Sequence, residues 1–257
     1  MVLREQLKRI SLLKYLVVSG RNLFDKHGIS DKIKALFFFF RSYRRYRKLP
    51  PNAALALRTA DLYPRLFDDT DHTPLDPVYF YQNTWCAKKV FTARPERHCD
   101  VGSQAEFVGI VSQFVPTTLV DIRPLPVTLP GLSFVTGSIE RLPFKDNEFL
   151  SLSSLCVIEH IGLGRYGDHL DTSGSEKAAA ELVRVLARGG SLYVSVPVDK
   201  ENKVYFNAHR AFTREYVLEL FEPLTLVEEK YVYGKSLFDS YNPAKGFGTG
   251  LYHFKKQ

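Results

Sequence analysis

The fold is decided by a stretch that opens with Arg97-His98-Cys99-Asp100-Val101-Gly102-Ser103 and closes with Gly189-Gly190-Ser191-Leu192-Tyr193-Val194-Ser195-Val196-Pro197-Val198. Between these two segments lie Val120-Asp121-Ile122-Arg123 and Val157-Ile158-Glu159-His160-Ile161-Gly162. Each segment brings polar residues or glycine together with a short β-branched run. Ligands of open parallel sheets bind at the carboxyl ends of the strands. The stretch therefore predicts a site for a nucleotide-type ligand.

Strand and helix patterns alternate along and beyond this stretch. The patterns predict helices at 105–114, 175–187 and 214–221, and strands at 97–103, 118–122, 132–136, 148–157, 191–198, 224–232 and 250–254. Such alternation is typical of βαβ units with right-handed crossovers. We expect an α/β fold with a doubly wound, seven-stranded, mostly parallel sheet and helices on both faces. Arg188-Gly189-Gly190 is expected to close the helix that precedes it.

Charge and composition divide the chain into a globular body and a basic arm. Residues 1–50 carry thirteen Lys or Arg and three Asp or Glu, a net of +10 against +7 for the whole chain, which leaves the other 207 residues at −3. Apolar residues make up 45% of the sequence, which is enough for a packed core. We expect a basic helical extension at 1–60, a linker and leading helix at 61–95, and the sheet domain at 96–257.

The cysteines and apolar runs indicate the compartment. Cys86, Cys99 and Cys156 are odd in number and lack metal-ligand spacing, which favours a reducing compartment and predicts no metal site. No stretch approaches the ~20 apolar residues of a transmembrane helix. The first residues lack the order of a signal peptide. The sequence thus predicts a cytoplasmic protein, with peripheral membrane contact as an additional property.

The basic arm predicts two amphipathic helices, at 2–19 and 29–48. The second places four adjacent phenylalanines, Phe37 to Phe40, ahead of a run of Arg and Lys interleaved with Tyr, and Pro50-Pro51 ends it. Three interpretations remain open. The arm is a helical lid packed on the body, a membrane-surface contact through residues 1–50, or a nucleic-acid binder, which is the least favoured because basic runs are usually just solvated.

Single residues at the strand ends suggest ligand contacts. Gly102 permits a tight turn and a close approach of backbone to ligand. Asp121 follows Asp100 by 21 residues, and a carboxylate there can accept both hydrogens of a ribose diol. Its other interpretation is a helix cap or a salt bridge with Arg123. Ser138 could bond an adenine edge while the next residue packs on its face, or the segment is a plain loop.

A second group of residues suggests an acceptor site. His160, with Glu159 as the second candidate, could accept a proton from a substrate hydroxyl, or it holds the loop through a backbone bond. The glycine-rich tract 161–172 is expected to shape the pocket with Arg165 and Tyr166. His209 and Arg210 could bind an anionic acceptor, such as a phosphate or a uronate.

The order of these motifs resembles a known family. It runs Asp-x-Gly, an acidic residue, Gly-x-x-x-x-Leu-Pro-Phe ending at Phe144, Glu-His-Ile ending at Ile161, and then Gly189-Gly190 with Ser-Val-Pro. The order is similar to that of class I S-adenosylmethionine-dependent methyltransferases over roughly residues 96–256. The stretch Glu159–Asp168, with Phe206-Asn207-Ala208-His209-Arg210, resembles an uncharacterised methyltransferase-like branch. Members of that branch often occur with polysaccharide-assembly genes, which implies a glycan or lipid-linked sugar acceptor.

The resemblance implies S-adenosylmethionine as the cofactor and assigns residues to it. The methionine side falls to Asp100, Gly102 and Ser103, the ribose to Asp121 with Ile122, the adenine to Ser138 and Ile139, and the sulfonium neighbourhood to Ser154 through Cys156, Leu155 included. The chain departs from the family pattern at four positions. Gln104 and Glu106 stand where the motif has glycines, Ser138 where an acid is common, and Leu150 where an Asp usually opens the strand.

These observations favour methyl transfer from S-adenosylmethionine to an oxygen or nitrogen of a glycan, a lipid-linked sugar or another small molecule. The alternative is a non-catalytic scaffold with the methyltransferase fold, recruited to the membrane surface with glycan-assembly enzymes. A nicotinamide-dependent oxidoreductase ranks lower, because Gly102-Ser103-Gln104 does not provide the Gly-x-Gly-x-x-Gly turn that such enzymes need.

Overall fold

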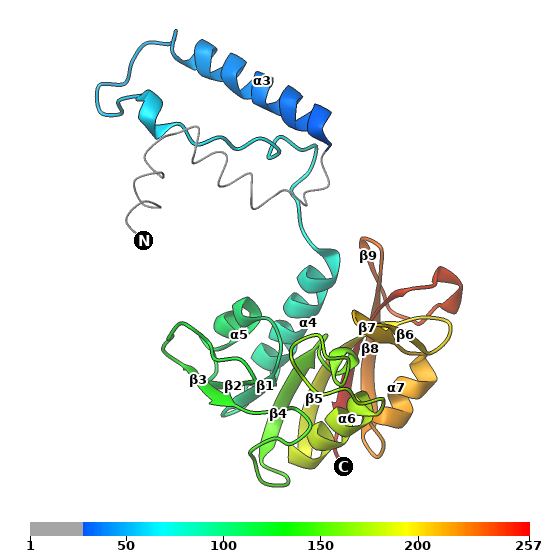
Figure 1. Ribbon diagram of the computed structural model, residues 1–257. Helices are drawn as coiled ribbons and strands as arrows, with labels where there is room; N and C mark the ends of the chain where they lie inside the picture. Colours follow the sequence, from blue (N-terminus) through cyan, green and yellow to red (C-terminus); the bar gives the residue numbers. More distant parts are fainter. Residues whose placement is uncertain (1–27) are drawn as a thin grey trace. The chain divides into compact units, whose positions relative to one another are not determined.

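A computed structural model of the chain describes residues 28–257 (Figure 1). The helix expected at 2–19 lies outside the described residues. The chain divides into two compact units, Met1–Pro74 and Leu75–Gln257. The expected segment 61–95 is therefore split at Pro74, and its helix belongs to the second unit. Within the described residues, no helix is both long and apolar enough to span a membrane.

The described part of the first unit consists of one long helix and an irregular segment. The helix α3 (Ile29–Tyr46) confirms the helix predicted at 29–48, and Arg47 follows it as the C-cap. None of its residues is buried. The Oη atom of Tyr43 lies 3.2 Å from Oγ1 of Thr59, which begins the short 3-10 helix η1 (Thr59–Asp61). One polar contact thus ties the helix to the segment that follows it.

The second unit is built on one sheet with strand order β3-β2-β1-β4-β5-β10-β8-β9. The first five positions run parallel, while β10 is antiparallel to both neighbours, β5 and β8. The strands are β1 (His98–Val101), β2 (Thr117–Asp121), β3 (Leu132–Thr136), β4 (Phe149–Leu155), β5 (Leu186–Val198), β8 (Thr225–Tyr233), β9 (Ser236–Phe238) and β10 (Gly248–Lys255). The doubly wound, mostly parallel sheet is confirmed, and the short β9 adds an eighth strand.

Helices cover both faces of the sheet. They are α4 (Pro77–Ala93), α5 (Ala105–Val111), α6 (Gly174–Val185) and α7 (Arg214–Leu220). On one face α4 and α5 pack around Trp85 and Phe107, and on the other α6 and α7 pack around Leu182 and Phe221. Along β5 the side chains alternate between these two cores, since Tyr193 contributes to the first core and its neighbours to the second. The sheet is therefore buried on both sides.

The expected end of the helix at 175–187 is wrong. The helix α6 ends at Val185, and Leu186 already begins β5. Gly189 adopts φ +75° inside the strand, where its N–H donates to the Lys256 carbonyl at 2.8 Å. The pairing of β4 with β5 shifts register beside these glycines. The glycines therefore form an irregularity in the strand, because pairing with the C-terminal strand competes with a helix cap.

Short elements complete the second unit. They are the hairpin of β6 (Lys203–Tyr205) and β7 (His209–Ala211), and the 3-10 helices η2 (Ile158–His160) and η3 (Pro243–Lys245). The sequence analysis did not predict them. Successive strands are added to the sheet in one direction up to β3 and in the other direction from β4 on, and β1 and β4 lie side by side in the middle of the sheet. In open α/β sheets the crevice beyond the carboxyl ends of two such strands is where ligands bind.

Candidate functional site

The turn after β1 requires glycine at its first position. Gly102 has φ +74°, a conformation that side chains disfavour. A Cβ atom added there would lie 2.9 Å from Cγ1 of Val157, so the space is also closed. The strand predicted at 97–103 stops at Val101 for this reason. The turn brings backbone up against the segment after β4 at the centre of the crevice.

A buried polar network supports this turn from below. The Asp100 carboxylate is fully buried and accepts the Ser103 N–H at 3.0 Å and the Ser103 hydroxyl at 2.7 Å. The hydroxyl of Ser153 also donates to it, and His98 bonds to that same hydroxyl at 2.9 Å. Burial raises the pKa of Asp100 to about 6. Asp100 therefore fixes the turn and lies behind the ligand crevice.

Two adjoining cavities open over the carboxyl ends of the strands. The larger has a volume of about 630 Å³, within the usual range for small-molecule sites, and the smaller has about 100 Å³. They share Gly102, Asp121 and His160 in their walls. Most predicted site residues line one or both, namely Gly102, Ser103, Asp121, Ile122, Ser138, Ile139, Leu155, Glu159, His160, Arg165, Tyr166 and His209. The structure thus brings the strand-end residues together.

Three predicted site residues lie outside the cavity walls. Asp100 is the first, as described above. Ser154 is fully buried, and its hydroxyl donates to the Val101 carbonyl at 3.0 Å, so it ties β4 to β1. Arg210 is the third, and it braces a neighbouring loop. These side chains hold the walls in place, and none of them reaches the space that a ligand would fill.

Asp121 lies at the end of β2 and is paired with Arg123. Its Oδ1 atom accepts the Arg123 backbone N–H at 2.8 Å, and both carboxylate oxygens lie 3.2 Å from guanidinium nitrogens. The guanidinium carbon of Arg123 also lies 4.8 Å from the centre of the Tyr166 ring, and that of Arg165 lies 5.1 Å from it. Asp121 therefore both forms the salt bridge with Arg123 and lies in the cavity wall.

His160 and Glu159 stand next to each other in η2 at the carboxyl end of β4. Nδ1 of His160 lies 2.7 Å from the Ala208 carbonyl oxygen. A carbonyl only accepts, so Nδ1 carries the proton and Nε2 is left as an acceptor, 3.7 Å from Oε1 of Glu159. Burial lowers the pKa of His160 to about 4 and raises that of Glu159 to about 8. At neutral pH both side chains are uncharged.

Glu159 holds an unmatched polar atom in the cavity wall. The side chain is 1% exposed, and its Oε2 atom has no hydrogen-bond partner among the described residues. An unpaired buried polar group costs about 1–3 kcal/mol. Glu159 lines the larger cavity, so a polar group of a bound molecule there can supply the missing partner.

Residues from distant segments complete the larger cavity. Tyr79 comes from the first turn of α4, where Asp76 caps the helix by accepting two backbone N–H groups. Phe247 directly precedes β10, and Thr249 lies within it. The sequence analysis missed these residues, because no local pattern brings α4 and β10 to the strand ends. Only the order of strands in the folded sheet does so.

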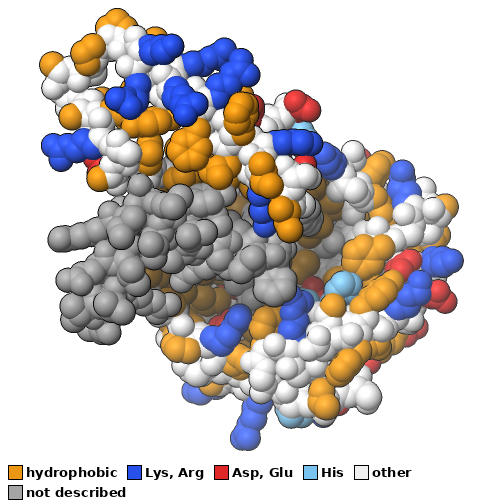
Figure 2. All heavy atoms as spheres, turned by 45° about the horizontal axis from the view of Figure 1, so that its top comes forward, with side chains coloured by type: hydrophobic (Ala, Val, Ile, Leu, Met, Phe, Trp, Pro, Cys, Tyr) orange, Lys and Arg blue, Asp and Glu red, His pale blue; other side chains and the backbone are white. Residues whose placement is uncertain are grey.

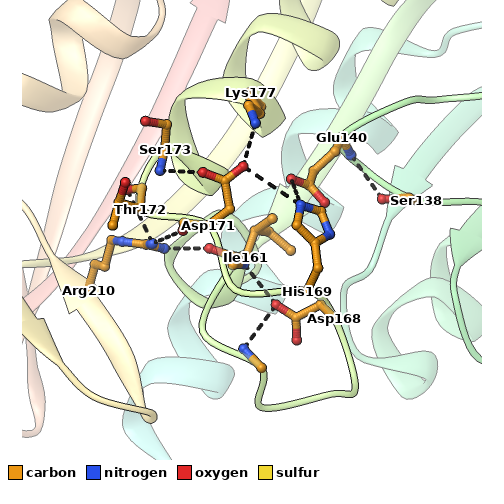
Figure 3. Close-up of polar contacts among 12 residues, drawn as sticks. Ser138, Glu140, Ile161, Asp168, His169, Asp171, Thr172, Ser173, Lys177 and Arg210 are labelled. Atoms are coloured by element: carbon orange, nitrogen blue, oxygen red, sulfur yellow. Dashed lines mark hydrogen bonds and ion pairs between the residues drawn. The ribbon is translucent and has the colours of Figure 1, made fainter.

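The loop 161–173 is held in one conformation from two sides (Figure 3). The Arg210 guanidinium donates to the Ile161 carbonyl at 2.5 Å and to the Asp171 carbonyl at 2.9 Å, which gives it a structural role. Asp168 accepts the backbone N–H groups of Gly162 and Gly164 at 2.8 and 3.2 Å. The loop that carries Arg165 and Tyr166 is thereby fixed at both of its ends.

An ion-pair cluster lies beside the same loop (Figure 3). Nε2 of His169 is 3.5 Å from a Glu140 oxygen and 3.7 Å from an Asp171 oxygen. Ligand atoms of these three residues lie close enough together for a metal ion. The Lys177 ammonium already pairs with Asp171, however, so a cation is in place. The cluster thus links the loop to α6 and to the segment after β3.

The sequence matches one family model in part. Residues 143–228 match a family described as Caenorhabditis protein of unknown function, DUF268. The matched range includes β4, η2, α6 and β5, and therefore Glu159 and His160. No curated protein matches the sequence.

Similar folds occur among solved structures. A 1,6-didemethyltoxoflavin-N1-methyltransferase of Burkholderia thailandensis, with bound S-adenosylhomocysteine, is 15% identical with a TM-score of 0.52, covering 90% of this chain and 91% of that one. The N-methyltransferase NodS of Bradyrhizobium japonicum, also with S-adenosylhomocysteine, is 15% identical at 0.52, covering 70% and 88%. The [4+2]-cyclase SpnF is 17% identical at 0.51, covering 68% and 81%. The sheet unit therefore has the fold shared by these methyltransferases and this cyclase.

Proposed function

We propose that this protein is an S-adenosylmethionine-dependent methyltransferase acting on an anionic small molecule. One observation carries the proposal: the Gly102 turn and the Asp121 carboxylate, at the ends of adjacent strands, line the same larger cavity as Glu159 and His160. Two proteins with this fold hold S-adenosylhomocysteine in their solved structures. Fold alone does not decide the chemistry, since a cyclase shares it.

The residues at the strand ends fit this cofactor. Asp121 can accept the two ribose hydroxyls once Arg123 releases it, and Ser138 and Ile139 line the smaller cavity beside it. The two motif glycines that this chain lacks are not needed by its backbone. Gln104 has φ −59°, and Glu106 lies within α5, so neither position needs glycine. The chain departs from the family pattern where its backbone permits it.

The bound cofactor supplies a methyl group already activated on a sulfonium. The chain has to align an acceptor with it and exclude water, and alignment alone contributes about 7–11 kcal/mol in well-oriented systems. With a pKa of about 4, His160 is a weak base. Its Nε2 atom can instead accept a hydrogen bond from the molecule that receives the methyl group and so orient it. Glu159, with a pKa of about 8, is protonated at neutral pH and can donate a hydrogen bond to the acceptor, whereas its ionised form, which gains population toward pH 8, can take a proton.

The charge of the larger cavity favours an anionic acceptor. Arg165 lines it and bonds to the Ala208 carbonyl at 2.9 Å, and among the described residues it forms no ion pair with a carboxylate. His209 lies beside it, with its ring centre 5.4 Å from that of Phe247. A carboxylate or phosphate can pair with the guanidinium while a sugar ring stacks on the aromatic side chains. The resemblance to the polysaccharide-associated branch favours a uronate or a sugar phosphate.

Isothermal titration with S-adenosylhomocysteine tests the proposal. We expect the wild-type protein to bind, and Asp121→Ala to weaken binding about tenfold or more, since it loses two hydrogen bonds to a charged group. Asp239→Ala is the matched control, because that exposed carboxylate pairs with Lys230 away from the cavity. Absence of wild-type binding at millimolar cofactor would overturn the enzyme proposal and leave the non-catalytic scaffold.

A further inference from the structure

The exposed side of α3 combines large apolar and cationic side chains. Successive residues of an α-helix are ~100° apart, so Ile29, Ile33, Phe37 and Phe40 share one side. They are 80%, 63%, 70% and 39% exposed. We call these four residues the apolar stripe. Singly exposed apolar residues are common on proteins, whereas a contiguous row of this size marks an interaction site.

The packed side of α3 borders the apolar stripe. Leu36, Phe39 and Tyr43 are the half-buried large hydrophobic side chains of the helix, and they share a side because they are spaced three and four residues apart. Tyr43 there contacts Thr59 of the same unit. Among the described residues, the apolar stripe therefore extends this packed side outward and is itself left exposed.

Positive charge surrounds the apolar stripe. Residues 28–48 contain seven Lys or Arg and one Asp, a net charge of +6. Phe37 and Phe40 line one hollow together with four cations, Arg41, Arg44, Arg45 and Lys48. Figure 2 shows Lys and Arg side chains interspersed with hydrophobic ones on the unit that carries α3. An occupant of this side must offer both an apolar environment and negative charge.

We infer that α3 lies in the headgroup region of an anionic lipid bilayer, with the apolar stripe inserted and the cations on lipid phosphates. Interfacial helices have this division of apolar and basic residues, and each surface cation contributes about 1 kcal/mol toward anionic lipid. A second copy of the helix would bring two charges of +6 together. A nucleic acid would satisfy the cations and leave the phenylalanines in water. This inference is independent of the proposed methyl transfer.

Vesicle flotation of the full-length protein tests the inference. One set of vesicles is phosphatidylcholine, and the other contains about 30 mol% phosphatidylglycerol, which gives a strongly anionic surface. We expect flotation with the anionic vesicles, and a lower bound fraction with neutral vesicles or at about 0.5 M salt, where charges are screened beyond ~4 Å. A wild-type protein that stays out of the anionic vesicle fraction overturns the inference.

Matched variants test whether vesicle binding depends on the apolar stripe or on any exposed phenylalanine. The double variant Phe37→Ser, Phe40→Ser is expected to lower vesicle affinity on the order of tenfold or more, since two buried rings are lost. Phe38→Ser is the control, because Phe38 is 58% exposed but lies ~100° or more away from the apolar stripe. Equal loss from both variants contradicts the inference. So does binding of a duplex RNA probe, read by fluorescence anisotropy, with no vesicle flotation. Circular dichroism of each variant verifies its fold.

Discussion

Arg123 donates to both carboxylate oxygens of Asp121, which are the acceptors that a ribose diol needs. Cofactor binding at Asp121 therefore has to break this salt bridge. The Arg123 side chain is 61% exposed, so the pair is worth only about 0–1 kcal/mol. We predict that Arg123→Gln tightens S-adenosylhomocysteine binding by up to about fivefold. Titration calorimetry measures it, with Arg123→Lys as the control that keeps the charge. Weaker binding by the Gln variant contradicts the competition.

Gly102 and Gly189 form a natural comparison, since their φ values are +74° and +75°. A Cβ on Gly102 would meet Val157 at 2.9 Å, whereas one on Gly189 has nothing within 4 Å. Gly189→Ala should lower the free energy of unfolding by about 1 kcal/mol through backbone strain alone. Gly102→Ala should lower it by a further 1–3 kcal/mol or so through the clash. Urea denaturation measures both, and equal losses would show that the turn after β1 has room.

Glu159 should make stability fall as the pH rises. The folded protein keeps the Glu159 proton up to about pH 8, whereas the unfolded chain releases it near the ordinary value of 4.5. The folded state thus binds more protons between these values, and the wild-type protein loses stability across that window. Glu159→Gln cannot titrate. We predict that its free energy of unfolding rises relative to wild type by up to a few kcal/mol between pH 5 and about 8.5. Denaturant titrations of both proteins at the two pH values test this, and a constant difference contradicts the raised pKa.

Substitution of two arginines near the crevice should affect different properties, stability for one and ligand binding for the other. Arg210 is 7% exposed and bonded to backbone carbonyls, so Arg210→Met should lower the free energy of unfolding by about 2–4 kcal/mol. Arg165 is exposed, and Arg165→Met should change it by no more than about 0.5 kcal/mol. Binding of glucose 1-phosphate, followed by the NMR signals of the His209 ring, should instead be lost with Arg165→Met. Arg165→Lys, which keeps the charge, should retain part of it. Unchanged phosphate binding by Arg165→Met would remove Arg165 from the acceptor site.

Local patterns sufficed for the sheet and for much of the crevice. The strand β3 has the predicted bounds, and the alternation of elements gave the parallel core of the sheet. Gly102, Asp121 and Glu159 are recognisable because parallel strands end at one edge, so residues that follow them come together. The predicted helix end at 187 is wrong because Gly189 and Gly190 pair with the C-terminal segment, which is far away in the sequence.

The sequence did not show which of the candidate side chains are buried. Asp100 and Ser154 carry the residue types of ligand contacts, yet their side chains turn inward to other strands. Arg210 has the charge for an anion, but loop carbonyls take its donors. Tyr79 and Phe247 line the larger cavity from segments with no motif. The side on which each residue lies depends on register and packing, which a single sequence does not display.

A structure determined with S-adenosylhomocysteine would show directly whether Asp121 holds the cofactor. We predict the ribose hydroxyls on the Asp121 carboxylate, the Arg123 guanidinium displaced from it, and the ligand passing over the Gly102 turn toward Glu159 and His160. A ligand bound elsewhere, with Asp121 still paired to Arg123, would contradict it.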